Sequence, residues 1–246
     1  LREEGAPPVE IDTDGIYFVP PKGVETEVKE RAFVERLNQS LAEGIEVSMD
    51  GRYRAMFSYK KKNYVLLDDK SHLMIKGSAL RSRGMEKYLR DFLSEMIRLL
   101  LEGRGGEVEG LLKKTMDKLE HHQVPISWLA KTEALSESPD IYREKVKQGK
   151  RNPAALYELA LGSGRSYRAG DQLSYYVTGE TKKVKVYENS KLASLYDPAS
   201  PDENVPYYQD KLLALVEKFK EFLPKKESVI PPVPKKGKRS RRSSKN

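Results

Sequence analysis

Residues 9–21 read VEIDTDGIYFVPP, and their pattern predicts a β hairpin. Two short apolar runs, residues 9–11 and 16–19, flank the tetrapeptide Asp12-Thr13-Asp14-Gly15, and an Asp-Gly pair is typical of tight hairpin turns. Two prolines end the second run, because proline cannot donate to a strand ladder. The stretch therefore places two carboxylates at the tip of a hairpin.

The carboxylates of Asp12 and Asp14 are close enough along the chain to reach one small volume. Two like charges held together are costly unless a cation neutralises them. Mg²⁺ prefers oxygen ligands, and proteins often hold it with one or two carboxylates together with substrate phosphates. The pair therefore indicates half of a divalent-metal site for phosphoryl chemistry. The alternative is a solvated Asp-x-Asp-Gly turn.

The composition bounds the kind of protein. The chain has 246 residues, 38% of them hydrophobic and 33% charged, which suits one large domain or two smaller ones. An apolar run of about 18 residues is absent from the sequence, so we expect no membrane span. Cysteine is also absent, which excludes disulfides and thiolate metal sites and fits a cytoplasmic protein.

The charge is unevenly distributed along the chain. Residues 225–246 hold nine Lys or Arg and one Glu, which accounts for the net charge of +8. Residues 1–50 carry five basic and twelve acidic side chains, whereas residues 51–90 carry eleven basic and three acidic ones. An acidic block beside a basic block suggests metal chemistry next to a polyanion track, with two ordinary solvated surfaces as the alternative.

Hydrophobic periodicity predicts an α+β fold. Strands are expected first, with a single helix among them, and most of the later chain is expected to be helical, apart from a late hairpin formed by residues 171–179 and 182–188. Two or three further strands are expected in residues 45–51, 53–69 and 73–77, and helices are expected at residues 26–43, 84–103, 107–121, 139–148, 153–161 and 207–223.

The acidic stretch has the form of a known motif. An apolar residue, Asp-Thr-Asp-Gly and an apolar-aromatic strand together resemble the third signature motif of family B DNA polymerases. By that resemblance, Asp14 is the principal ligand of two catalytic Mg²⁺ ions and Asp12 is a supporting carboxylate. The family usually has Tyr and a small residue before the first aspartate, and this chain has Glu10 and Ile11 there.

Two basic stretches follow in the order that the family shows. "SYKKKNYVLL" resembles the family's Lys-Lys-x-Tyr element through Lys61, Lys62 and Tyr64, which offer phosphate contacts and a ring for a sugar or base edge. The alternative is an edge strand protected by lysines. "IKGSALRSRGMEKYLRDF" resembles the entry to the thumb, and the residues expected to hold primer phosphates there are Lys76, Arg81, Arg83 and Arg90. A basic loop before a helix is the alternative for this second stretch.

Weaker similarities continue to about Leu223. They comprise "LAKTEALSESPDIYR", "NPAALYELA", "YRAGDQLSYYV" and "YYQDKLLALVEKF", which resemble successive parts of the family's thumb. The resemblance implies an antiparallel palm-type sheet with a helix in residues 1–83. It implies a mostly helical thumb with a small β hairpin in residues 84–224. Residues 225–246 are expected to form a disordered basic tail.

Two family motifs do not occur in these 246 residues. They are an Asp-x-x-Ser-Leu-Tyr-Pro motif with the other metal aspartate, and a Lys-x-x-x-Asn-Ser-x-Tyr-Gly helix that grips the triphosphate. We therefore expect the C-terminal part of a DNA-directed DNA polymerase that binds primer-template DNA and deoxynucleoside triphosphates. Its two-Mg²⁺ site is expected to need a residue outside this chain, and activity to need the N-terminal part, attached covalently or as a second chain.

Two other functions remain open at this point. One is a non-catalytic DNA-binding module that retains the palm and thumb fold. The other is a metal-dependent nuclease, which would need further carboxylates converging on Asp14.

Overall fold

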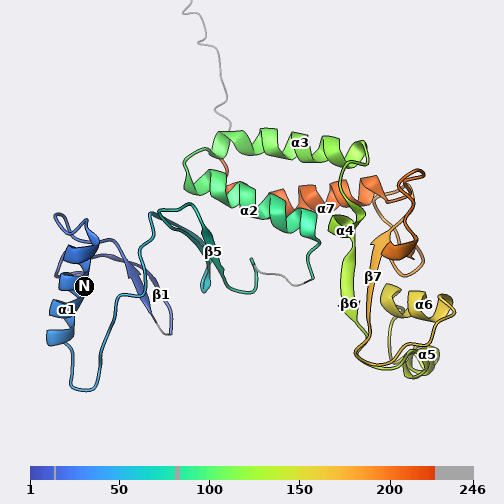
Figure 1. The fold of residues 1–246 in the computed structure, drawn as a ribbon, viewed down its shortest axis with the longest axis horizontal. Coiled ribbons are helices and arrows are strands. Elements are labelled where there is room, and N and C mark those ends of the chain that lie inside the picture. Colours follow the sequence, from blue (N-terminus) through green and yellow to red (C-terminus); the bar gives the residue numbers. More distant parts are fainter. Residues whose placement is uncertain (14, 81–83, 225–246) are drawn as a thin grey trace, which may run out of the picture.

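The structure is a computed structural model that describes residues 1–13, 15–80 and 84–224. The molecule is elongated (Figure 1). One end holds the hairpin of strands β1 (Pro8–Ile11) and β2 (Ile16–Phe18) with helix α1 (Glu27–Gln39), and the other end holds helices α5 (Pro139–Lys147) and α6 (Ala155–Gly162). Strands β1 (Pro8–Ile11) and β2 (Ile16–Phe18) pair antiparallel, with Ile11 opposite Ile16. The predicted hairpin is therefore present.

Helix α1 (Glu27–Gln39) lies beside this hairpin. The hydroxyl of Thr26 accepts a hydrogen bond from the Lys29 N–H, as an N-cap should. Phe33 is buried, and its ring packs 5.8 Å from the ring of Phe18 on β2. One aromatic pair thus joins the helix to the hairpin.

A second antiparallel sheet has the order β3–β4–β5. Its strands are β3 (Ala55–Lys60), β4 (Asn63–Leu67) and β5 (Leu73–Lys76). Residues 64–67 of the central strand are all buried, because this strand is covered on both faces. The prediction of a strand at residues 45–51 is wrong, since the amide side chain of Asn38 bonds both the N–H and the C=O of Val47 and takes the place of a partner strand.

Three long helices form the central layer of the molecule (Figure 1). They are α2 (Lys87–Leu101), α3 (Val108–Glu120) and α7 (Val205–Lys218), with 3₁₀ turns at Gly105–Glu107 and Lys220–Phe222. The apolar residues of α2 recur every three or four positions, so they share one face, and seven of its residues are buried. Phe57 and Val65 of the second sheet belong to the same core. This core is continuous across the expected palm and thumb boundary at residues 83 and 84.

The far end of the molecule is built on a third sheet of order β6–β7–β8. Strand β7 (Gln172–Val177) pairs with β6 (Lys131–Ala134) and with β8 (Ser190–Leu192), and a 3₁₀ turn follows at Ala193–Leu195. Helices α5 (Pro139–Lys147) and α6 (Ala155–Gly162) enclose a second core around Tyr142 and Tyr157, while the short helix α4 (Ile126–Leu129) leads into β6.

The α+β class is confirmed, and each predicted helix is present within a few residues of its expected ends. The late hairpin is wrong in its second strand: residues 182–188 form turns, and β7 takes β6 and β8 as partners instead. The tail predicted at residues 225–246 lies outside the described residues. Among the helices that the structure describes, none is long and apolar enough to span a bilayer.

Candidate functional site

The acidic turn between β1 and β2 is tight. The backbone N–H of Asp12 donates to the carbonyl of Gly15 at 2.9 Å, which closes the turn. The N–H of Thr13 donates to Oδ1 of Asp12 at 2.7 Å, so the carboxylate is held by its own turn. Asp14, the residue expected to be the principal metal ligand, lies outside the described residues.

A lysine from the second sheet reaches this turn. Nζ of Lys62 donates to Oγ1 of Thr13 at 2.9 Å and lies 3.2 Å from Oδ1 of Asp12. The Thr13 N–H and the Lys62 ammonium lower the pKa of Asp12 below its ordinary range, with a smaller contribution from the nearby charge of Lys76. The structure therefore places Lys62 of the lysine motif in contact with Asp12 of the acidic motif, with the positive charge of Lys76 nearby.

The position of Lys62 follows from its own turn. Lys60 pairs with Asn63, so Lys61 and Lys62 form a two-residue connection between β3 and β4. Lys62 has a φ of 62°, in the left-handed region that residues with a Cβ seldom adopt. The side chain of Asn63 stabilises the connection by donating to the Lys61 carbonyl at 3.0 Å and accepting from the Ala79 N–H at 2.8 Å.

Gly77 permits the chain after β5 to approach this turn closely. Its φ is +90°, and a Cβ at this position would lie 2.3 Å from the carbonyl oxygen of Lys62 and 2.4 Å from Oδ1 of Asn63. Only glycine fits that space and that backbone conformation. The glycine thus has a structural role: it allows the chain after β5 to lie against the turn formed by Lys61 and Lys62.

Tyr64 has a different place from the one its motif suggested. The residue is 2% exposed, and its ring packs edge-on against Tyr17 of β2 with centroids 5.3 Å apart. Its hydroxyl lies 3.4 Å from that of Tyr17, and burial raises its pKa, so the hydroxyl stays protonated. Tyr64 therefore joins the two sheets, and its ring is not presented to solvent as a surface for a sugar or base.

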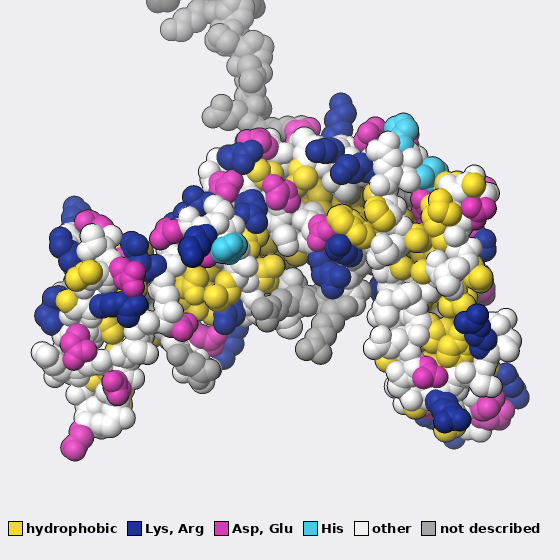
Figure 2. All heavy atoms as spheres, in the orientation of Figure 1, with side chains coloured by type: hydrophobic (Ala, Val, Ile, Leu, Met, Phe, Trp, Pro, Cys, Tyr) yellow, Lys and Arg dark blue, Asp and Glu magenta, His cyan; other side chains and the backbone are white. Residues whose placement is uncertain are grey.

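The remaining basic residues differ in their surroundings. Lys61, Lys76 and Arg90 are exposed, and within the described part of the chain their side chains make no hydrogen bond or ion pair. Arg81 and Arg83 lie outside the described residues. On the face drawn in Figure 2, basic and acidic side chains are interspersed over the described surface. Among the described residues, the candidate phosphate contacts are thus Lys61 and Lys76 on the second sheet and Arg90 on α2.

The carboxylates of the described residues do not form a metal site by themselves. In residues 1–13, 15–80 and 84–224, no cluster of three or more acidic or histidine side chains is placed to bind an ion. Oδ1 of Asp12 is engaged by Thr13 and Lys62, while its Oδ2 makes no hydrogen bond with a described residue. Asp12 thus offers one free oxygen, and a complete site needs further ligands.

Sequence reasoning missed three residues that build this site: Thr13, Tyr17 and Asn63. Thr13 shares Lys62 with Asp12, Tyr17 packs on Tyr64, and Asn63 stabilises the lysine turn. A signal for Asn63 was present, because asparagine side chains commonly bond the backbone of tight turns. The pairing of Tyr17 with Tyr64 depends on tertiary packing and had no signal in the sequence.

Comparison with known sequences gives one consistent family. The profile of DNA polymerase family B matches residues 12–222. A DNA polymerase of Pyrococcus horikoshii is 25% identical over 236 residues, which cover 93% of this chain and 18% of that protein. A DNA polymerase of Methanocaldococcus jannaschii is 26% identical over 208 residues, which cover 81% of this chain and 12% of that protein.

Comparison with solved structures agrees on the fold. The family B DNA polymerase of the archaeon Pyrobaculum calidifontis superposes with a TM-score of 0.68 at 19% identity. The match covers 92% of this chain and 28% of the other. The chain therefore spans less than a third of the length of these similar proteins.

Proposed function

Because the chain belongs to DNA polymerase family B, we propose that it is the palm and thumb part of a DNA-directed DNA polymerase. Residues 1–83 would complete the palm, and residues 84–224 would form the thumb. The observation that carries the proposal is the contact of Lys62 with Asp12 and Thr13. It joins the acidic motif and the lysine motif in one place, where a primer end and its phosphates would meet.

Asp12 and Asp14 would hold Mg²⁺ together with a carboxylate from outside this chain. The free Oδ2 of Asp12 and the lowered pKa of this residue support the assignment, because a metal ligand must be ionised. When bound, the metal pair would lower the pKa of the primer 3′-hydroxyl and stabilise the charge on the leaving pyrophosphate. The Thr13 N–H and Lys62 both lower the pKa of Asp12, and both contact its Oδ1.

Primer-template DNA would be held through its phosphates. Lys61 and Lys76 are exposed cations near the acidic turn, and Arg90 presents a third on α2. Arg81 and Arg83 belong to the same proposed group by their place in the sequence. Such contacts position a duplex without reading its bases, so binding should be independent of sequence and sensitive to salt.

A second polypeptide segment would cover the hairpin. Val9, Ile11, Ile16 and Val19 lie on or beside β1 and β2, and between 47% and 61% of each is exposed. Apolar side chains gathered on so small a sheet are typical of a surface that another part of a protein buries. With the short share of its relatives that the chain spans, this supports a requirement for the N-terminal part of the polymerase.

Primer extension tests the proposal. The chain would be assayed with Mg²⁺ and all four deoxynucleoside triphosphates, alone and with the polypeptide encoded upstream of it. We expect extension only in the mixture, and we expect Asp14→Asn to abolish it while DNA binding survives. Asp50→Asn is the matched control, because Asp50 is exposed and makes no ion pair among the described residues.

The alternative function gives a different result. A non-catalytic DNA-binding module would bind primer-template DNA tightly, yet the mixture would not extend a primer. Extension that persists with Asp14→Asn would reject the proposed role of that residue.

A further inference from the structure

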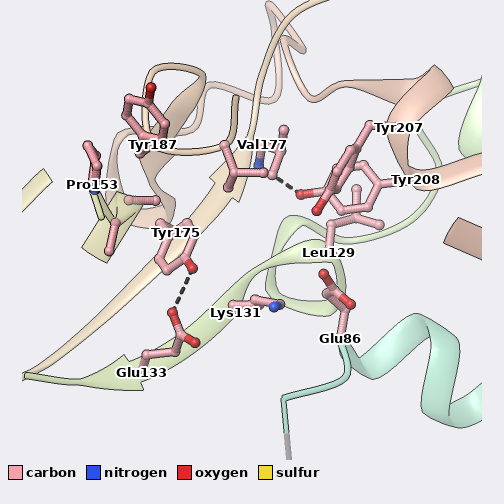
Figure 3. A pocket seen from close by; sticks show the side chains of 13 residues that line it. Glu86, Leu129, Lys131, Glu133, Pro153, Tyr175, Val177, Tyr187, Tyr207 and Tyr208 are labelled. Carbon is pink, nitrogen blue, oxygen red and sulfur yellow. Dashed lines mark hydrogen bonds between the residues drawn. The ribbon is translucent and has the colours of Figure 1, made fainter. Parts of the chain in front are cut away.

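A pocket of about 370 Å³ lies where α2, β6, β7 and α7 converge, far along the molecule from the acidic hairpin (Figures 1 and 3). Its volume is in the range of small-molecule sites. The polar and aromatic side chains that line it are Glu86, Lys131, Glu133, Tyr175, Tyr187, Tyr207 and Tyr208. The polymerase function proposed above uses none of them.

Glu86 is an unusual residue in this wall. It is 3% exposed and stands just before α2, yet its side chain does not cap the helix. Its Oε1 forms an ion pair with Lys211 of α7, and its Oε2 is buried without a hydrogen-bond partner among residues 1–13, 15–80 and 84–224. A buried carboxylate oxygen left unpaired is costly, and native structures seldom retain one without a reason.

Two more polar groups beside Glu86 lack a partner in the part of the chain that the structure describes. Lys131 of β6 makes no hydrogen bond or ion pair with the described residues, and its ammonium end points toward Glu86 (Figure 3). The hydroxyl of Tyr207 likewise makes no hydrogen bond within the described chain. Burial and the nearby Glu86 carboxylate raise the pKa of Tyr207, so this hydroxyl remains a donor. One wall therefore presents an acceptor and two donors.

The opposite wall is already satisfied. The hydroxyl of Tyr175 donates to Oε2 of Glu133 at 2.6 Å, which leaves mainly the aromatic ring to face the pocket. The charges of the pocket also balance, since Lys211 neutralises Glu86, and Lys131 offsets Glu133. The ligand that fits is neutral and flat, with a hydrogen-bond donor beside an acceptor.

We propose that this pocket binds a single nucleobase. An exocyclic amino group or a ring N–H would donate to Oε2 of Glu86, and a neighbouring carbonyl or ring nitrogen would accept from Lys131. The base would lie among the tyrosine rings, since every base has an aromatic face. A cationic side chain of a partner protein fits less well, because Lys131 would repel it. The base can come from a free nucleoside or from an unpaired position in a strand.

NMR titration of the isotope-labelled chain tests the proposal. Deoxycytidine is the probe for a base that is not part of a strand. Two single-stranded oligonucleotides of equal length, oligodeoxycytidylate and an abasic analogue, are the other probes. We expect deoxycytidine and oligodeoxycytidylate to shift the resonances of Leu129, Val177 and Tyr207 saturably. Lys131→Met should weaken this binding roughly tenfold, as expected for the loss of a charged hydrogen bond.

Lys131→Met should fold normally, because the Lys131 side chain makes no hydrogen bond or ion pair with the described residues. The matched control is Lys113→Met on α3, whose lysine is also unpaired among the described residues, and binding should be unchanged there. If oligodeoxycytidylate shifts these resonances and deoxycytidine does not, the pocket is still a base-binding site, and its ligand is a base within a strand. Equal shifts with the abasic strand would overturn the proposal in favour of a phosphate contact. No shift at the pocket with any probe would also overturn it.

Discussion

Lys62 and Asp12 form an ion pair between the tips of two separate hairpins, with Nζ 3.2 Å from Oδ1. The same ammonium bonds Thr13, which lies 49 residues away along the chain. The same Oδ1 also accepts a hydrogen bond from the Thr13 N–H of its own turn, so groups from both hairpins hold the aspartate side chain. The contact therefore makes the acidic turn dependent on the lysine turn, and its consequences can be measured.

The first prediction concerns the pKa of Asp12. Thr13 and Lys62 both lower this pKa, so Lys62→Met should raise it part of the way towards its ordinary value of 3.8. The ¹³C chemical shift of the Asp12 side-chain carboxyl, followed by NMR as the pH is lowered, gives the pKa in each protein. Lys61→Met is the control, because Lys61 occupies the same turn and forms no ion pair with any described residue. An equal rise in both variants would contradict the specific contact.

The second prediction follows from the same lowered pKa. A group whose pKa is lower in the folded state stabilises the fold above its unfolded pKa, and this contribution is lost as pH falls through the folded value. The difference in the free energy of unfolding between wild type and Asp12→Asn should therefore be constant near neutral pH. Once the pH falls below about 5, the wild type should lose stability relative to the variant. Urea unfolding at a series of pH values measures it. A difference independent of pH down to 3 would refute the linkage.

The third prediction separates the two neighbouring lysines in DNA binding. Lys61 is exposed and makes no ion pair in the described part of the chain, so Lys61→Met should reduce the slope of log K against log salt by about 0.9, the value for one phosphate contact. Lys62 already shares its charge with Asp12, so Lys62→Met should change the slope less. Fluorescence anisotropy with a primer-template duplex between low and moderate salt gives both slopes. Equal slopes would show that the ion pair leaves Lys62 fully available.

The fourth prediction is that Gly77→Ala destabilises the chain. The new methyl group would overlap the carbonyl oxygen of Lys62, and alanine strains a φ of +90°. We expect a loss of at least about 2 kcal/mol and a fall in Tm of several degrees. Gly110→Ala is the matched control, since Gly110 lies within α3 with open space around it and should be neutral or stabilising. Similar Tm values for both variants would contradict the close approach.

The fifth prediction compares two adjacent tyrosines of α7. The hydroxyl of Tyr208 accepts a hydrogen bond from the buried N–H of Val177 at 2.8 Å, whereas the hydroxyl of Tyr207 has no partner among the described residues. Tyr208→Phe would leave that N–H unsatisfied and should cost about 1–3 kcal/mol. Tyr207→Phe should leave the free energy of unfolding nearly unchanged. Chemical denaturation of the two variants measures the difference.

Local signals predicted those elements whose partners are near in the sequence. The Asp-Gly pair located the first turn, and the three-and-four spacing of α2 located its buried face. Local sequence patterns gave the wrong secondary structure where contacts with residues distant in the sequence determine it. Residues 182–188 alternate like a strand, but Val184 and Val186 instead pack against the main core from a turn. The polar segment Ser190–Leu192 takes the place beside β7.

The candidate site shows the same limit. Both motifs were recognisable from the residues, and their proximity near Asp12 is what the structure adds. The burial of Tyr64 could not be predicted, because it depends on Tyr17 from the other hairpin. The pocket around Glu86 gave no signal either, since its lining residues are scattered between positions 86 and 208.

The buried apolar residues of the described chain form two clusters, and this division affects how the molecule unfolds. Phe57 and Val65 share their cluster with α2 and α7, so the second sheet and the long helices should unfold as one cooperative unit. Helices α5 and α6 close a smaller cluster around the stacked rings of Tyr142 and Tyr157. Amide hydrogens at this far end should exchange through a separate, lower-energy opening, while those of α2 should exchange only when the whole central unit unfolds.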